Sequence, residues 1–184
     1  MNINEYQNYH ETKAHTSAEF PYNTYLCSIP LDFPGVPLHW HDELELVVIK
    51  RGQGFVSVDF DKRLVHSGDI IIIPPRCLHA IEQDDTFKME YENIIFKPDL
   101  LSSGANDLCM IQYIVPLLDG SLPIEYFLTP ALGSFEALSN CIRQIDLVCA
   151  DQTPGWQLAV KSSLFNFFFL LISERQKKTV STSS

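Results

Sequence analysis

The chain has 184 residues, enough for one domain, and 46% of them are apolar, enough to fill a core. Its formal net charge of −10 would repel the phosphate backbone of a nucleic acid, which argues against DNA binding by this chain itself. Its five scattered cysteines include no C-x-x-C pair, so they indicate reduced thiols rather than a disulfide framework or a zinc knuckle.

The first 98 residues carry the patterns of a polar segment followed by β-structure. Residues 1–21 are polar and predict a loose amino-terminal arm. In residues 22–98, short strand patterns alternate with turn signals, which is typical of a β-sandwich or barrel. The predicted strands are YNTYLCSI, LELVVIK, GFVSVDF, RLVH, DIIIIP, LHAIEQ and MEYENIIF. Gly52 and Gly54 predict a tight turn between the second and third strands, and DIIIIP is apolar on both faces, which predicts a core strand.

Residues 99–178 are predicted to be a helical dimerisation region. DLCMIQYIVPLL predicts a short helix that Pro116 would break, and SLPIEYFLTP predicts an extended connector. From Ser134 to Cys149 apolar residues recur at helical spacing. A second helix, from Gly155 to about Lys177, follows the turn DQTPG. We therefore expect two antiparallel α-helices after the β-domain.

The last of these helices is apolar on nearly every side, which requires burial against more than one surface. A second subunit would supply one such surface, and deep burial within a single chain is the alternative. The predicted homodimer interface consists of Leu164, Phe165, Phe168, Phe169 and Ile172. The longest apolar run, LFNFFFLLI, has about half of the ~20 residues that a membrane span needs, and the amino terminus has no signal-peptide pattern. We expect a soluble, cytoplasmic protein without membrane contact.

The stretch LHWHDELEL, residues 38–46, concentrates titratable groups where a buried strand would normally carry aliphatic residues. His39 and His41 are two residues apart, so on a strand both side chains point the same way. Glu45 follows in the same stretch, and His79 lies in a later strand. Neutral imidazoles with one carboxylate suit a divalent transition metal such as zinc, nickel, iron or manganese. The alternative is a set of hydrogen-bonded pocket residues without a metal.

Two further charged residues are candidates for an effector pocket. Arg76 lies just before His79, at the expected mouth of a barrel, where it would clamp a carboxylate or a sugar hydroxyl; its alternative role is a solvated loop cation. Glu43 would bind effector hydroxyls or face water at a bend. The predicted effector-binding residues are His39, His41, Glu43, Glu45, Arg76 and His79.

The spacing His39-x-His41-x3-Glu45 resembles the first sequence motif of the cupin superfamily. The segment GDIIIIPPRCLH, which ends at His79, resembles the second motif, although Arg76 stands where that motif has a turn glycine. The resemblance implies a mainly β fold, a cupin-type double-stranded β-helix barrel or jelly roll. All four positions that hold a metal in that family are filled here, by His39, His41, Glu45 and His79.

A narrower resemblance covers roughly residues 20 to 178. PLHWHDELELVVIKRGQGFVSVDF and GDIIIIPPRCLHAI, with the two following helices, are similar to the amino-terminal sensing domain of AraC-type transcription regulators. This resemblance implies a barrel that binds a small polar effector, an arm that can close over it, helices that form a homodimer, and a separate helix-turn-helix part that reads DNA. This chain shows no recognition helix or basic stripe. Residues 179–184 would then be a tail or the start of a linker, in either a truncated regulator or a sensor-only protein.

Two functions follow from these resemblances. The first is a small-molecule-sensing and dimerisation domain of an AraC-family regulator, without catalysis. The second is a small metal-dependent cupin enzyme, such as an oxygenase, isomerase or epimerase, in which the same four residues hold the metal. An enzyme needs a further base or substrate clamp, for which the sequence offers only Glu43 and Arg76, so the helical pair favours the regulator.

Overall fold

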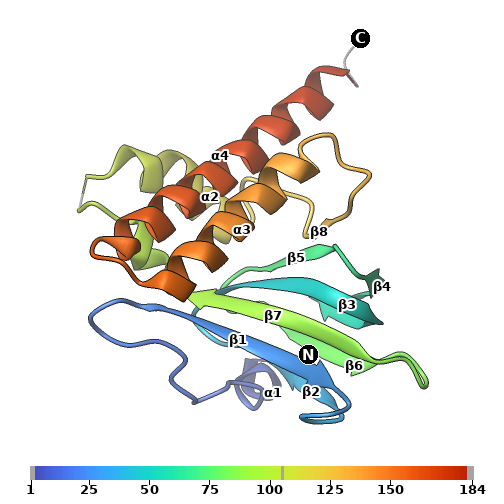
Figure 1. Ribbon diagram of the computed structural model, residues 1–184. Helices are drawn as coiled ribbons and strands as arrows, with labels where there is room; N and C mark the ends of the chain where they lie inside the picture. The colour runs from blue at the N-terminus through green and yellow to red at the C-terminus, as the bar shows by residue number, and fades with distance from the viewer. Residues whose placement is uncertain (1–2, 105, 182–184) are drawn as a thin grey trace. The chain divides into compact units, whose positions relative to one another are not determined.

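The computed structural model describes residues 3–104 and 106–181, which divide into two compact units. The first unit extends to Pro98 and includes Tyr126–Leu128, and the second holds the remaining residues. The first unit is built mainly of β-strands and the second of helices (Figure 1). This confirms the prediction of a mainly β fold followed by helices.

The first unit consists of two antiparallel sheets that share one long strand, β3. In the first sheet the strand order is β1-β7-β3-β5-β8, and in the second sheet β6 pairs with β2 on one side and β3 on the other, while β3 also pairs with β4. The strand bounds are β1 Tyr22–Ile29, β2 Gly35–His39, β3 Leu44–Val58, β4 Asp61–His66, β5 Ile70–Ile73, β6 His79–Gln83, β7 Met89–Phe96 and β8 Phe127–Leu128. β3 pairs with β7 and β5 through its first half and with β6 and β4 through its second half.

The predicted turn at Gly52 and Gly54 is wrong, because β3 runs through both residues. Gly52 has a φ of 79°, and a Cβ atom at this position would lie 1.8 Å from the carbonyl oxygen of Lys88. The pairing of β3 with β7 also shifts register between Ile49 and Arg51. The glycine therefore serves a bulged strand that passes from one sheet to the other, and not a hairpin.

The core of the first unit is aliphatic and draws on both sheets. All four isoleucines of β5 are buried, as the apolar pattern of DIIIIP predicts. The main cluster consists of Ile29, Val47, Ile49, Val56, Val58, Val65, Ile71, Ile73, Ile81, Met89, Tyr91 and Phe127. Burial of this much apolar surface is the main driving force for the fold of the unit.

Most predicted strands are present, and β1 and β7 have the predicted bounds. The sequence patterns do not predict β2 or β8. β2 contains Pro37, which is tolerated because this strand pairs only with β6 and so lies at a sheet edge. β8 has two residues, Phe127 and Leu128, which pair with β5 from within the predicted connector.

The first helical segment of the second unit differs from the prediction. A π-helix at Met110–Ile114 leads directly into α2, Val115–Leu118. Pro116 does not break this segment, since it lies in the first turn of α2, where a missing N–H costs little. A short 3-10 helix, Pro98–Leu101, precedes it along the chain.

The predicted antiparallel helix pair is present as α3, Phe135–Asp151, and α4, Trp156–Ser181, which lie side by side (Figure 1). α3 ends because Gln152 takes a left-handed conformation with φ 48°, and its N–H bonds to Val148 O at 3.0 Å. The helix buries Leu138, Cys141, Ile142 and Ile145. Residues 179–181 of the predicted tail continue α4, whereas residues 1–2 of the predicted arm and 182–184 of the tail lie outside the described residues.

α4 is apolar over a longer stretch than the run LFNFFFLLI alone indicates. By length and composition, Trp156–Arg175 could cross a membrane, although the core helix of a soluble protein meets the same criterion. Its buried residues are Val160, Leu164, Phe167, Phe168 and Leu171. By contrast, the side chain of Phe169 is 63% exposed.

Candidate functional site

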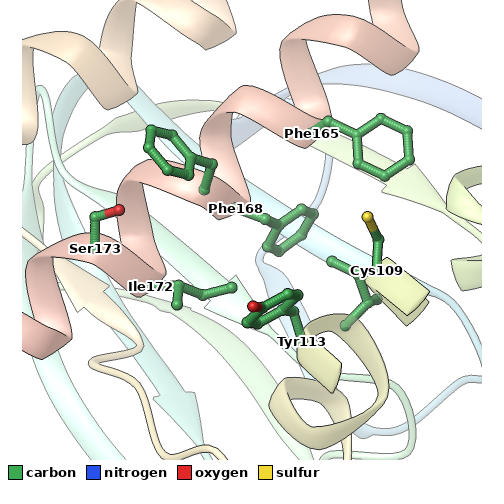
Figure 2. Close-up of a pocket in the computed structure, with 8 residues that line it drawn as sticks. Cys109, Tyr113, Phe165, Phe168, Ile172 and Ser173 are labelled. Atoms are coloured by element: carbon green, nitrogen blue, oxygen red, sulfur yellow. The ribbon is translucent and has the colours of Figure 1, made fainter. Parts of the chain in front are cut away.

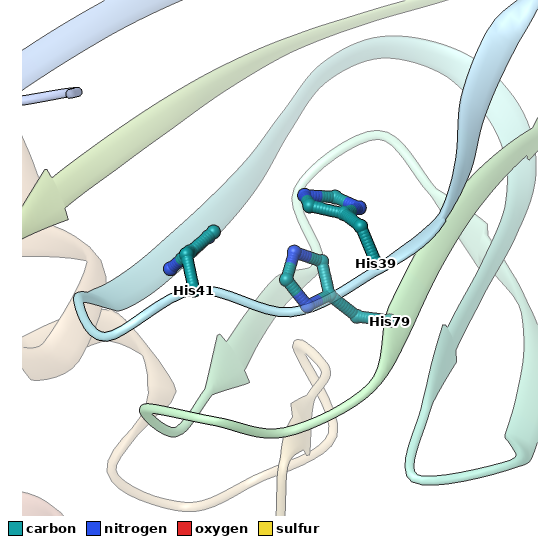
Figure 3. Close-up of side chains that lie close together, drawn as sticks. All are labelled: His39, His41 and His79. Carbon is teal, nitrogen blue, oxygen red and sulfur yellow. The ribbon is translucent and has the colours of Figure 1, made fainter. Parts of the chain in front are cut away.

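The three predicted histidines converge in the first unit. His39 ends β2, His41 follows it, and His79 begins β6, where it pairs directly with His39. One potential ligand nitrogen of each ring lies within 4.8 Å of the others (Figure 3). The β2–β6 pairing therefore brings together residues that are 40 positions apart in the sequence.

Glu45 completes this cluster from β3. Its Oε2 atom lies 3.0 Å from His41 Nε2 and 3.3 Å from His79 Nε2, and the residue is only 3% exposed. Burial alone would raise the pKa of Glu45, but the hydrogen bond from His41 and the neighbouring His79 imidazole outweigh it, so the pKa falls well below its usual range. The buried carboxylate is therefore ionised.

Hydrogen bonds on the outer side of the cluster fix two of the three imidazoles. His39 Nδ1 donates to Pro37 O, and His79 Nδ1 donates to Cys77 O, each at 2.9 Å. Because a carbonyl oxygen only accepts, these bonds leave Nε2 of both rings as the acceptor nitrogen in the neutral form. On the third ring, His41 Nδ1 lies 3.7 Å from Glu43 Oε2. Outward hydrogen bonds like those of His39 and His79 are the usual support of metal-binding histidines.

The imidazoles differ in their tendency to take up a proton. Burial, together with the nearby His79, lowers the pKa of His39. Burial also acts to lower the pKa of His41, but the hydrogen bond and charge of Glu45 reverse this, and its pKa is raised. His39 is thus held in its neutral form, with Nε2 as the nitrogen that carries the free lone pair. His41 instead shares a proton with the Glu45 carboxylate when no cation is bound.

The donor set fits a divalent transition metal. His41 Nδ1 and His79 Nε2 are buried and have no hydrogen-bond partner among the described residues, although unpaired buried polar atoms are costly. His79 Nε2 faces the cluster, where a cation would satisfy it and offset the charge of Glu45. The three histidines could therefore hold a metal, with the Glu45 carboxylate beside them.

A cavity of about 310 Å³ surrounds the cluster and includes residues that the sequence patterns do not single out. Its lining consists of Glu11, Lys13, His15, Tyr25, Cys27, Phe33, Gly35, Val36, Pro37, His39, His41, Glu45, His79, Ile81, Tyr91, Asn93 and Ile95. Glu11 and His15 come from the arm, and their side chains bond to each other at 2.9 Å. The only sequence signal for this pair is the polarity of the arm.

Four residues of the arm, Tyr6, Tyr9, His10 and Glu11, contact Trp40. The Trp40 ring stacks with Tyr6 at 4.8 Å and with His10 at 4.1 Å between ring centroids. The main chain adds hydrogen bonds from Trp40 N to Tyr9 O at 3.0 Å and from Glu11 N to Trp40 O at 2.9 Å. Since Trp40 lies between His39 and His41, these contacts bring the arm to the cavity.

Two of the predicted effector-binding residues do not line this cavity. Arg76 has a side chain that is 72% exposed, and its Nε donates to Asp42 Oδ1 at 2.8 Å. Its φ of 62° explains why the related motif has glycine here. Glu43 is buried, but it contacts the outer side of His41. Both remain candidate effector residues only as predictions.

The predicted dimer residues fall into two groups on α4. Leu164 and Phe168 are buried within the chain. Phe165, Phe169 and Ile172 line an apolar cavity of about 610 Å³ in the second unit (Figure 2). Its lining is Cys109, Tyr113, Ile114, Phe165, Phe168, Phe169, Ile172 and Ser173.

Comparison with known families favours the regulator over the enzyme among the two sequence-based interpretations of this site. Residues 31–168 match the model of the AraC-like ligand binding domain, which covers the histidine cluster, α3 and the first half of α4. The chain belongs to this family. Among curated proteins, the AraC-like ligand-binding domain described here is 32% identical over 159 residues to the uncharacterized HTH-type transcriptional regulator YdeC of Bacillus subtilis. This match covers 86% of the chain and 54% of YdeC, so the chain spans about half of that relative.

Other similarities are weaker. A second Bacillus subtilis regulator, the uncharacterized HTH-type transcriptional regulator YbfI, is 26% identical to this AraC-like domain over 72 residues, which cover 39% of the chain and 26% of YbfI. Among solved structures, a cupin protein from Bacteroides fragilis is 24% identical with a TM-score of 0.41, over 48% of this chain and 80% of its own. Because this TM-score is low, we assign the fold from the strand pairing and not from this similarity.

Proposed function

We propose that this AraC-like ligand-binding domain senses a small polar effector in the cavity around His39, His41, Glu45 and His79, and that it does so without catalysis. In the proposed regulator, a helix-turn-helix part outside this chain reads DNA in the cytoplasm. The convergence of three histidines and a buried carboxylate carries the proposal, because a small cavity with a few polar groups is the common form of a ligand site.

The proposal includes a divalent transition metal, such as zinc, nickel, iron or manganese, held by the same four residues. Bound there, the metal would supply a positive charge that balances Glu45 and attracts polar ligand atoms. The neutral form of His39 and the outward hydrogen bonds of His39 and His79 support this part of the proposal.

Metal binding is expected to stabilise the folded chain. Zinc at a hundredfold excess over its Kd should raise the free energy of unfolding by about 2.7 kcal/mol, since the assembled site exists only in the folded state. Urea denaturation of untagged, metal-stripped protein at increasing zinc concentration measures this gain. Magnesium is the control, because it prefers oxygen ligands and should stabilise little. An unchanged urea midpoint with zinc would contradict a metal site.

The metal-dependent cupin enzyme is the second candidate, favoured by the completeness of the ligand set. The two groups that sequence analysis offers as a further base or clamp, Glu43 and Arg76, lie outside the cavity lining. Homology to transcriptional regulators, and the position of these two residues, support the sensor over the enzyme.

We also propose that the two sheets of the first unit close into the cupin-type jelly roll. Two observations support closure. β3 belongs to both sheets, and one aliphatic cluster contains residues of both, for example Ile71 from β5 and Ile81 from β6.

The homodimer belongs to the same proposal, with Phe165, Phe169 and Ile172 as the contacting residues. Phe169→Lys should convert the dimer into a monomer, because the 63% exposed ring would be replaced by a charge inside an apolar interface. Light scattering at tens of micromolar measures the mass. Gln157→Lys, at another exposed position of α4, is the control and should stay dimeric. A wild-type chain that is monomeric at this concentration would contradict the proposal.

A further inference from the structure

The arm brings a carboxylate of its own to the candidate site. Glu11 Oε2 lies 2.9 Å from His15 Nε2 and 3.4 Å from His39 Nε2, and all three residues line the cavity. Glu45 is engaged differently, by His41 and His79. The cavity thus has two carboxylate positions, one filled from the sheet and one filled from the arm.

The two residues that receive Glu11 are held independently of it. His15 O accepts hydrogen bonds from Asn23 Nδ2 at 3.0 Å and from Tyr25 OH at 3.3 Å, which tie His15 to β1. His39 is fixed by its bond to Pro37 O. If Glu11 moved away, both imidazoles would still line the cavity, and His15 Nε2–H would lack its acceptor.

Glu11 itself belongs to the segment that is anchored through Trp40. Its own N–H bonds to Trp40 O, and its side chain is 30% exposed, so it sits where the arm meets solvent. Aromatic stacking and main-chain hydrogen bonds hold residues 6–11, together with hydrogen bonds from Trp40 Nε1 to Tyr6 O and from Tyr6 OH to Arg76 O. Each of these contacts is individually weak enough to open locally.

We propose that Glu11 is an internal ligand of this site, and that the effector is a small carboxylate that takes its place beside His15 and His39 and thereby loosens the arm. This inference rests on the proposed sensor function and names its ligand class. A carboxylate is favoured because the position already holds one, with the His15 imidazole as its donor, and the nearby Lys13, which also lines the cavity, adds a positive charge.

The test uses Glu11→Gln, which keeps the size of the side chain but removes its charge, with Glu19→Gln as the matched control at an exposed position of the arm. Succinate is the probe and its neutral diamide is the control ligand. An internal ligand that occupies its position about 90% of the time weakens the apparent affinity about tenfold. Calorimetry should therefore show that Glu11→Gln binds succinate about tenfold more tightly than the wild type or Glu19→Gln.

Hydrogen exchange of residues 6–11 gives a second readout. Exchange should become severalfold faster in Glu11→Gln and in the wild type saturated with succinate, but not with the diamide. The wild-type comparison holds even if the variant fails to fold. The inference is overturned if succinate does not bind, if Glu11→Gln binds it no more tightly, or if succinate leaves exchange unchanged. Zinc binding is measured separately on the same samples. If the wild type does not bind zinc, the proposed metal site is contradicted. If zinc binds but succinate affinity is the same in Glu11→Gln and the wild type, only the role of Glu11 is contradicted.

Discussion

Gly52→Ala should destabilise the first unit by about 3 kcal/mol or more. A left-handed conformation costs a non-glycine residue about 1–2 kcal/mol, and here the new Cβ would also lie 1.8 Å from Lys88 O, a backbone atom that can move only if the β3–β7 pairing shifts. Urea denaturation followed by circular dichroism measures the loss.

Gly120→Ala separates the two contributions to this loss. Gly120 has the same φ of 79°, but no atom in the described part of the chain lies within 4 Å of a Cβ atom placed there. The control should therefore lose only the 1–2 kcal/mol of backbone strain. Equal losses in the two variants would show that the close approach of β3 to Lys88 O is not required for the fold.

His79→Ala should lower the affinity for zinc by more than about 100-fold. Loss of an outer hydrogen-bond partner of a metal ligand already costs 10–100-fold, and His79 would contribute a donor atom itself. Its removal also leaves Glu45 with one imidazole in place of two. Equilibrium dialysis against zinc, followed by elemental analysis, measures the change.

His66→Ala is the matched control for this experiment. His66 lies on β4 with a side chain that is 58% exposed, outside the cavity lining. It should bind zinc as the wild type does. If both variants lose zinc equally, the metal is bound elsewhere or through unfolded chains, and if neither does, His79 is not a ligand.

The fold was predictable wherever local periodicity decides it. β1, β7 and α3 follow from alternating or helical spacing within their own segments, and the buried β5 follows from its uniform apolar residues. Features set by distant contacts were not predictable in this way. The continuity of β3 through Gly52 depends on β7, and the two-residue β8 forms only because β5 offers it a partner.

The same distinction applies to the site. His39 and His41 share a face because of their spacing, whereas His79 joins them through the β2–β6 pairing, which only the family resemblance indicated. Glu11 reaches the cavity because aromatic rings of the arm stack on Trp40, and His15 because its carbonyl oxygen bonds to β1. Neither contact leaves a periodic signal. Arg76 was expected at the cavity from its proximity in sequence to His79, but a backbone at φ 62° and the pair with Asp42 keep it in solvent.

X-ray absorption spectroscopy of the zinc-loaded, untagged chain tests the central proposal most directly. We expect three imidazole nitrogens and at least one carboxylate oxygen around a single zinc, at about 2.0–2.2 Å, with no sulfur. Cys27 lines the same cavity, so the absence of sulfur is informative. Fewer than three imidazoles, or a scatterer at the roughly 2.3 Å of a zinc–sulfur bond, would contradict a site built from His39, His41, Glu45 and His79.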